Sequence, residues 1–96
     1  MLVLITYDVN TTDLSGARRL RRIAKECQNY GQRVQNSVFE CVVDGATFVV
    51  LQNKLLKIMD QEKDSIRFYF LGKHHQDKIK HFGCKPGYDV EDVLML

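Results

Sequence analysis

The spacing of hydrophobic positions changes along the chain, and each change marks a predicted element. Residues 2–9 open with four aliphatic side chains, followed by Thr6 and Tyr7. Such a run without alternation is typical of a strand covered on both faces. After residue 13 the apolar positions recur at three- and four-residue steps, which indicates a helix with one apolar face. These positions are Leu14, Ala17, Leu20, Ala24 and Cys27.

Residues at both ends of this helix fit its predicted bounds. The side-chain oxygen of Thr12 or Asp13 can accept the free N–H groups of the first turn. At the other end Tyr30-Gly31 is expected to stop the helix, because Gly31 can adopt the left-handed conformation.

Four further elements are expected downstream. They are a strand over residues 32–43 bent near 35–37, a well-buried helix over 46–59, a strand over 65–71 and a short strand over 79–84. In the third of these, Ile66, Phe68 and Phe70 share one face, with Arg67 and Tyr69 on the other.

Turn-forming and polar residues separate these elements. We expect a turn at 44–45 that opens the second helix at Asp44 or Thr47, a polar connection over 60–64, an exposed loop over 73–78 and a turn at 85–87. The tail, residues 89–96, ends in four apolar side chains. It is expected to add a strand to a sheet edge, in its own subunit or in a partner.

This order of elements predicts an α+β fold of the ferredoxin-like βαββαβ type. We expect one domain over residues 1–96, with residues 85–96 as a C-terminal tail or strand. Two helices can cover only one face of the sheet, which would leave Tyr7, Phe39 and Tyr69 on the other. A homodimer with two-fold symmetry that packs sheet on sheet would cover that face.

Composition restricts the function classes without identifying one. The chain has 96 residues, a net charge of +2 and a pI near 8.5, which alone does not indicate nucleic-acid binding. Its three cysteines are far apart, which favours free thiols in a reducing cytoplasm over a disulfide framework. The first apolar run is too short for a signal peptide and no stretch is long enough to span a membrane, so we expect a cytoplasmic protein.

The positive charge is concentrated on the first predicted helix. Five basic residues, Arg18, Arg19, Arg21, Arg22 and Lys25, stand against one nearby acid, Glu26. A solvated helix surface is the simplest interpretation of such a run. Like charges at four-residue spacing weaken a helix, however, and a bound polyanion would offset that repulsion. We therefore favour contact with phosphate groups, with Arg18, Arg22 and Lys25 on one face.

Asp8 is the candidate for chemistry, because it carries a carboxylate out of a buried strand to the edge of the core. The plain alternative is a turn residue that bonds the backbone. The histidines at 74, 75 and 81 match no standard zinc spacing, and no phosphate-binding glycine loop or nucleophile motif is present. Mg²⁺ often takes one or two protein carboxylates, so Asp8 from two subunits can form one site near a two-fold axis.

Several segments resemble the CRISPR-associated protein 2 family. They are Tyr7-Asp8 at the end of the first strand, the arginine cluster at 18–22, Tyr30-Gly31 and, most specifically, Val34-Gln35-Asn36-Ser37-Val38-Phe39-Glu40. The resemblance extends over nearly the whole chain, in order and with normal spacing.

The resemblance implies an Mg²⁺-dependent endonuclease, with Mn²⁺ as the alternative ion, in the spacer-acquisition machinery of CRISPR antiviral defence. Its substrate would be double-stranded DNA, its metal ligand Asp8 of both subunits, and its C-terminal strand would be exchanged with or added to the partner subunit. The implied phosphate-binding residues are Arg18, Arg19, Arg22, Lys25 and Arg33. Tyr7, Asn10, Phe39 and Glu40 are candidates for the dimer face or for supporting the site.

Two other functions remain open at this point. One is a non-catalytic DNA-binding adaptor that bridges dimers of the CRISPR-associated integrase. The other is an endoribonuclease acting on single-stranded RNA. Phosphate contacts carry no information on base or sugar, so the sequence does not separate DNA from RNA.

Overall fold

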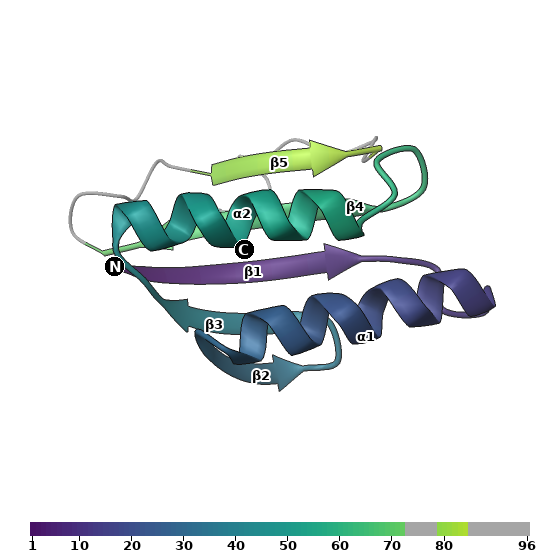
Figure 1. The fold of residues 1–96 in the computed structure, drawn as a ribbon, viewed down its shortest axis with the longest axis horizontal. Coiled ribbons are helices and arrows are strands. Elements are labelled where there is room, and N and C mark those ends of the chain that lie inside the picture. The colour runs from purple at the N-terminus through teal and green to yellow at the C-terminus, as the bar shows by residue number, and fades with distance from the viewer. Residues whose placement is uncertain (73–78, 85–96) are drawn as a thin grey trace.

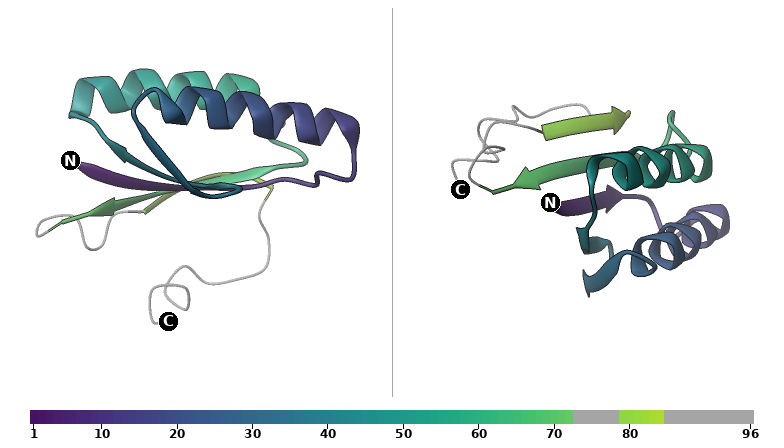
Figure 2. Two further views of the ribbon diagram at one scale, coloured as in Figure 1. Left: turned by 90° about the horizontal axis from the view of Figure 1, so that it is seen from below. Right: turned by 60° about the vertical axis from the view of Figure 1, so that its left-hand side comes forward.

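The computed structural model describes residues 1–72 and 79–84, which form a sheet with both helices packed on one face (Figures 1 and 2). The elements in chain order are β1 (Leu2–Asp8), α1 (Leu14–Gln28), β2 (Gly31–Gln35), β3 (Val38–Val42), α2 (Gly45–Ile58), β4 (Ser65–Leu71) and β5 (Ile79–Gly83). Within these residues the strand order is β2-β3-β1-β4-β5, and each neighbouring pair is antiparallel. This topology confirms the predicted ferredoxin-like arrangement.

The central strand β1 organises the core. It pairs with β3 on one side and with β4 along its full length on the other. Val3, Ile5 and Tyr7 are buried under the helices, and the residues between them face the opposite side. No described element packs over that opposite side, which we call the open face (Figure 2). The apolar run at residues 2–9 is therefore the central strand, as its composition suggests. The described elements cover only one of its two faces.

Two of the three aromatic residues predicted on the open face lie elsewhere. Tyr7 and Phe39 belong to the core cluster under the helices, so that placement was wrong for both. Tyr69 alternates with the buried Phe68 and Phe70 and does lie on the open face, as expected. When a strand has apolar residues at every position, the pattern does not show which alternate residues face the core. The sequence therefore could not show on which face Tyr7 and Phe39 lie.

The segment predicted as one bent strand is a β-hairpin. β2 and β3 are joined by a turn at Asn36 and Ser37, with an irregular register between Arg33 and Gln35. The guanidinium of Arg33 donates to the Asn36 carbonyl at 2.8 Å and so braces the turn. Asn and Ser favour turns because their side chains bond the nearby backbone. The predicted bend is therefore a complete turn between two paired strands.

Gly31 does not stop α1 in the way predicted. Asp13 caps the start of α1 by accepting the Ser15 N–H at 3.0 Å, as expected, but the helix ends at Asn29 in ordinary right-handed geometry. Gly31 already belongs to β2, and it is not among the described glycines with positive φ. Its lack of a side chain is needed because a Cβ there would overlap the Glu40 carbonyl oxygen and lie 2.6 Å from the Cys41 Cα.

The second half of the domain follows the predicted order of elements, but α2 is less buried than predicted, because Val49 and Val50 are exposed and only Phe48, Leu51 and Leu55 are buried. Asp44 caps α2 by accepting the Thr47 N–H at 2.7 Å. From α2, Phe48 packs edge-on against Phe68 and Phe70, with ring centroids 5.2 and 4.9 Å away. The loop at 73–78, the turn at 85–87 and the tail at 89–96 lie outside the described residues. Neither α1 nor α2, the helices of the described part, is long and apolar enough to cross a membrane.

Candidate functional site

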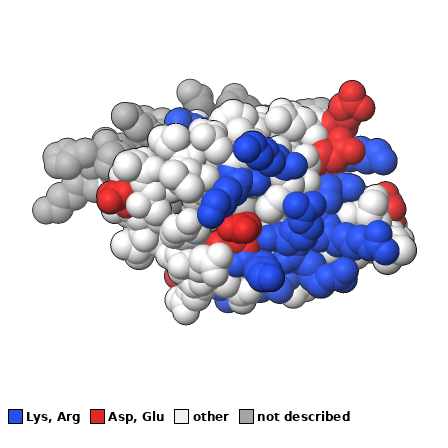
Figure 3. Space-filling model, viewed as in Figure 1, with Lys and Arg blue, Asp and Glu red and all other residues white. Residues whose placement is uncertain are grey.

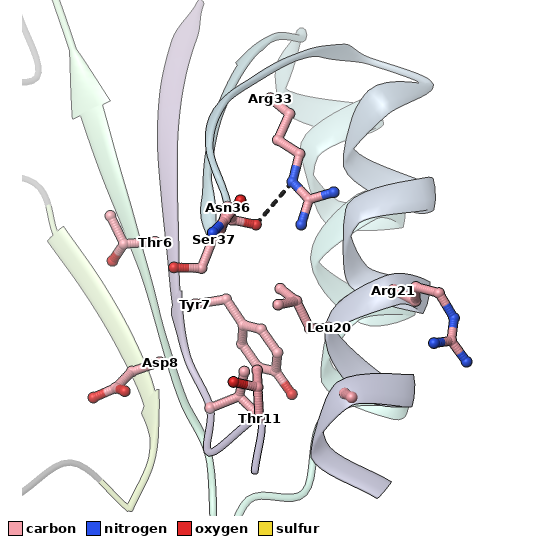
Figure 4. A pocket seen from close by; sticks show the side chains of 11 residues that line it. Thr6, Tyr7, Asp8, Thr11, Leu20, Arg21, Arg33, Asn36 and Ser37 are labelled. Carbon is pink, nitrogen blue, oxygen red and sulfur yellow. Dashed lines mark hydrogen bonds between the residues drawn. The ribbon is translucent and has the colours of Figure 1, made fainter. Parts of the chain in front are cut away.

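Asp8 stands at the last position of β1, opposite Ser65 of β4. Its side chain is exposed on the open face and points away from α1, whereas the neighbouring Tyr7 points toward α1 (Figure 4). The chain then turns at Asn10, whose side-chain oxygen accepts the backbone N–H of Thr12 at 3.0 Å and the Thr12 hydroxyl at 2.7 Å. Asn10 therefore shapes the exit from β1, and Asp8, which itself makes an interaction in the structure, is exposed at the end of the strand.

Two residues that sequence analysis did not assign to a site share the open face with Asp8. Arg67 of β4 lies opposite Thr6 of β1, and His81 of β5 lies opposite Arg67. Arg67 is buried, and both residues make interactions in the structure. The alternation along β4 predicts Arg67 and the buried Phe68 on different faces of the sheet. What the sequence did not provide is strand pairing, which brings the Arg67 guanidinium and the His81 imidazole into the row next to Asp8.

A single copy of the chain offers few metal ligands. Among residues 1–72 and 79–84, no group of three or more His, Cys, Asp or Glu side chains could hold a metal ion. Glu40 lies on the open face but pairs with Leu4, four residues before Asp8, and its carboxylate accepts from Gln32 at 3.4 Å. Asp8 alone is a hard oxygen ligand of the kind Mg²⁺ prefers. The residues therefore fit Mg²⁺ where water, phosphate or a second copy completes the ligand set.

A cavity of about 570 Å³ opens beside the end of β1. It lies between β1, the first half of α1 and the turn of the β2–β3 hairpin (Figure 4). Leu20 and the Tyr7 ring line its apolar side, and Asn36 and Arg33 line its polar side. The Arg33 guanidinium lies 5.8 Å from the centroid of Phe39. Arg33 is thus exposed on the helix side of the hairpin, and Asp8 also lines the cavity, although its side chain points away from α1 (Figure 4).

Most of the predicted phosphate-binding residues gather on the outer side of the two helices (Figure 3). Arg18, Arg21, Arg22 and Lys25 are exposed on α1, and Lys54 and Lys57 are exposed on α2. We call these six residues the basic helical surface. Glu26 offsets part of the charge, with its carboxylate 3.9 Å from the Lys54 ammonium. The basic helical surface covers the helix layer, whereas Asp8 lies on the open face.

Arg19, which was also predicted to contact phosphate, is held by a buried carboxylate. Its side chain is 14% exposed and forms a two-pronged ion pair with Asp64, with Nε at 2.7 Å from Oδ2 and Nη2 at 3.0 Å from Oδ1. Asp64 is 0% exposed and also accepts the Tyr7 hydroxyl and, at 3.0 Å, the Asp60 N–H. Arg19 therefore points into the core, and we name Tyr7, Arg19 and Asp64 the Asp64 network.

The charges in the Asp64 network stabilise one another. Burial alone would raise the pKa of Asp64, but hydrogen bonds from Arg19, Tyr7 and the Asp60 N–H lower that pKa below its ordinary value. Burial and the bond to Asp64 raise the pKa of Tyr7, and the same carboxylate raises the pKa of Arg19. At neutral pH the network therefore holds a carboxylate, a phenol and a guanidinium. Sequence analysis placed Asp64 in a polar connection, because an aspartate before a strand carries no pattern that indicates burial.

Comparison with known proteins connects this architecture to one family. The family model described as CRISPR associated protein Cas2 matches residues 1–79. A protein of Chlorobaculum tepidum named CRISPR-associated endoribonuclease Cas2 is 62% identical over the whole of both chains. One from Halalkalibacterium halodurans named CRISPR-associated endonuclease Cas2 is 56% identical and aligns over 99% of each chain.

Solved structures show the same fold. The crystal structure of Streptococcus pyogenes Cas2 superposes with a TM-score of 0.74 at 60% identity, over 75% of this chain and 87% of that one. A hypothetical protein from Thermus thermophilus superposes with a TM-score of 0.66 at 30% identity, over 75% of this chain and 82% of the other.

Proposed function

The chain belongs to the CRISPR-associated protein Cas2 family, and from this premise we propose that it is a metal-dependent endonuclease that acts in CRISPR spacer acquisition. The observation that carries the proposal is the position of Asp8. Its carboxylate is exposed at the end of the central strand, on the face that no described helix covers. Relatives named as nucleases share more than half of the residues of this chain.

In this proposal Asp8 from each of two chains holds one Mg²⁺, with Mn²⁺ as the alternative ion, between two open faces. When bound, the ion would polarise a phosphodiester and offset the charge that develops on it during hydrolysis. The polypeptide supplies orientation. Thr6 and Ser65 border Asp8 along and across the sheet, and Arg67 in the neighbouring row adds positive charge on the same face.

The proposed substrate is double-stranded DNA. The basic helical surface extends over two helices, which suits the closely spaced phosphates of a duplex. The names of the relatives include both endonuclease and endoribonuclease, so single-stranded RNA is the competing substrate. Because phosphate contacts do not distinguish the sugars, cleavage must be compared directly on both.

The decisive experiment measures cleavage of linear double-stranded DNA and of single-stranded RNA by wild type and Asp8→Ala, each with Mg²⁺ and with EDTA. Glu62→Ala is the matched control, since it removes an exposed carboxylate from the turn before β4. We expect cleavage that requires both Mg²⁺ and Asp8 and that Glu62→Ala retains. Equal cleavage by wild type and Asp8→Ala would refute the assignment of Asp8, and cleavage of RNA alone would replace the substrate.

A second function is favoured by the distance between the basic helical surface and Asp8 in the fold. Because the two lie on opposite sides of the sheet, the helices can hold DNA without bringing it to the carboxylate. The chain would then serve as a non-catalytic adaptor that presents DNA to the CRISPR-associated integrase. In that case Arg18→Glu with Arg22→Glu abolishes spacer acquisition in cells, while Asp8→Ala leaves acquisition intact. The opposite pattern would exclude the adaptor role.

A further inference from the structure

We propose that Tyr7 and Asp64 are positioning residues for Asp8, and that Arg19 ties them to α1. This inference rests on the proposed function, in which Asp8 holds the metal ion. It assigns a role to Asp64, a buried charged residue outside the predicted site. It also gives Arg19 a role other than phosphate contact.

The first step in the argument is the geometry of β1. Tyr7 and Asp8 are consecutive, so their side chains leave the strand on opposite faces. The Tyr7 ring is buried in the core, and its hydroxyl donates to Asp64. Its backbone N–H donates to the Ser37 carbonyl at 2.9 Å. The backbone N–H and the side-chain hydroxyl of Tyr7 are therefore both held by hydrogen bonds. These bonds restrict the orientation of the peptide that leads to Asp8 and so the direction of the Asp8 carboxylate.

The second step is the strand opposite Asp8. Ser65 is the cross-strand partner of Asp8, and Asp64 immediately precedes it. The backbone of Asp64 is itself held, because its N–H donates to the Asp60 carbonyl at 2.7 Å and its carbonyl accepts the Cys84 N–H at 2.9 Å. The Asp64 side chain, through its hydrogen bond with Tyr7, thus links the residues next to Asp8 and Ser65, the last pair of the β1–β4 ladder. Ends of strands open readily where few contacts hold them, and this pair is reinforced at that point.

The third step is the connection to α1. Arg19 donates to both carboxylate oxygens of Asp64, and its Nη1 also donates to the Ser15 hydroxyl at 3.2 Å. Planar two-pronged pairs of this kind fix orientation as well as distance. The neighbours of Arg19 in sequence and one turn on, Arg18 and Arg22, are exposed on the basic helical surface. Arg19 is therefore the inward member of the arginine cluster and fixes α1 over the end of β1.

Tyr7→Phe is the sharpest test, because it keeps the buried ring and leaves Arg19 and the Asp60 N–H on Asp64. Tyr30→Phe is the matched control, since it removes a hydroxyl from another aromatic residue packed against the core. Ile23→Val removes one buried methyl group from α1 and controls for a loss of stability that does not touch Asp64. Asp8→Ala sets the level of binding without the proposed ligand.

Two readouts are needed, and neither is nuclease activity. The first is Mn²⁺ affinity, from the electron paramagnetic resonance signal of free Mn²⁺ at a temperature where every variant is folded by circular dichroism. Loss of a residue that orients a metal ligand typically weakens metal binding about 10- to 100-fold. We expect a loss in that range for Tyr7→Phe and none for Tyr30→Phe or Ile23→Val. The second readout is metal-free amide exchange, which should accelerate at the end of β1 in Tyr7→Phe alone.

The outcomes separate this inference from the proposed function. If Asp8→Ala loses Mn²⁺ binding while Tyr7→Phe binds as wild type with unchanged exchange, the positioning role is refuted and the metal site stands. If Ile23→Val weakens Mn²⁺ binding as much as Tyr7→Phe, the effect is general stability and the positioning role is again refuted. If Asp8→Ala binds Mn²⁺ as tightly as wild type, the metal site and the positioning role fail together.

Discussion

At the scale of single residues, Asp64 should govern the stability of the domain in acid. Its pKa is lowered in the folded state, whereas an unfolded aspartate titrates near 3.9. The stabilisation is therefore complete above about pH 4 and is lost as the pH falls through the lower, folded pKa. Breaking a buried pair by removing one partner costs about 3–5 kcal/mol, and Asp64→Asn should cost somewhat less because it keeps the shape of the side chain.

Urea unfolding between pH 2 and 7 measures this effect. The difference in free energy of unfolding between wild type and Asp64→Asn should be largest at neutral pH and shrink in acid. A difference that stays constant across this range would mean that the Asp64 charge contributes nothing to stability. Asp60→Asn, in the same turn, is the control because Asp60 is only partly buried.

The same residues mark the limit of what sequence reveals at this scale. Asp8 could be proposed as a site residue, because a carboxylate at the end of an apolar strand is conspicuous in the sequence. Arg19 could not be separated from Arg18 and Arg22, since a basic run looks uniform until its partner is known. That partner, Asp64, lies 45 residues away in sequence from Arg19. An ion pair of such long range follows from the packing of α1 on the sheet, which no local pattern encodes.

At the scale of elements, the β2–β3 hairpin depends on Gly31. A Cβ at this position would meet backbone atoms of β3, which cannot rotate away, so β2 would have to shift outward. Gly31→Ala should lower the free energy of unfolding by about 1–3 kcal/mol, the usual cost of overpacking. Gly45→Ala is the matched control, because a Cβ at the start of α2 meets nothing within 4 Å.

Gly45→Ala should be neutral or stabilising by up to about 1 kcal/mol, through the lower entropy of the unfolded chain. Chemical denaturation of the two variants beside wild type gives the comparison. An equal change in the free energy of unfolding for both variants would show that the overlap with Glu40 adds no cost of its own at residue 31. A loss of unfolding free energy in Gly45→Ala but not in Gly31→Ala would contradict both the crowding at Gly31 and the open space at Gly45.

The elements themselves were largely predictable, and the errors have one physical origin. Both helices and β4 have periodic apolar positions, and their bounds were close to those observed. β1 is apolar at nearly every position, and the segment from β2 to β3 mixes polar and apolar residues without a clear alternation. The sequence therefore gave neither the face of Tyr7 and Phe39 nor the hairpin turn at Asn36 and Ser37. Cross-strand pairing decides these features, and pairing is non-local.

At the scale of the whole molecule, the basic helical surface should control how salt affects nucleic-acid binding. Each phosphate contact contributes about −0.9 to the slope of log affinity against log salt concentration on duplex DNA. Arg22→Gln should flatten that slope by about one unit, as measured by fluorescence anisotropy of a labelled duplex. Lys80→Gln is the control, because Lys80 belongs to the edge strand β5 and is not one of the six residues of the basic helical surface, and its ammonium lies 5.5 Å from the centroid of the Phe48 ring. Identical slopes for both variants would remove Arg22 from the interface.

The last prediction concerns the second copy of the chain that the proposed metal site requires. Leu2 pairs with Val42 and with Leu71, so three exposed apolar residues form one row across β3, β1 and β4 on the open face. Exposed apolar groups of this kind mark association surfaces. Val42 is 71% exposed, so Val42→Lys should leave the single chain folded but place an unpaired charge in a sheet-on-sheet dimer.

Sedimentation equilibrium of Val42→Lys should therefore show a dimer dissociation constant raised at least about tenfold, or 1.4 kcal/mol. Val50→Lys is the control, since Val50 is 48% exposed on α2, on the other side of the sheet. If Val50→Lys disrupts the dimer and Val42→Lys does not, the chains associate through their helices. Two open faces would then point apart, and a metal ion held jointly by two Asp8 carboxylates would be geometrically impossible.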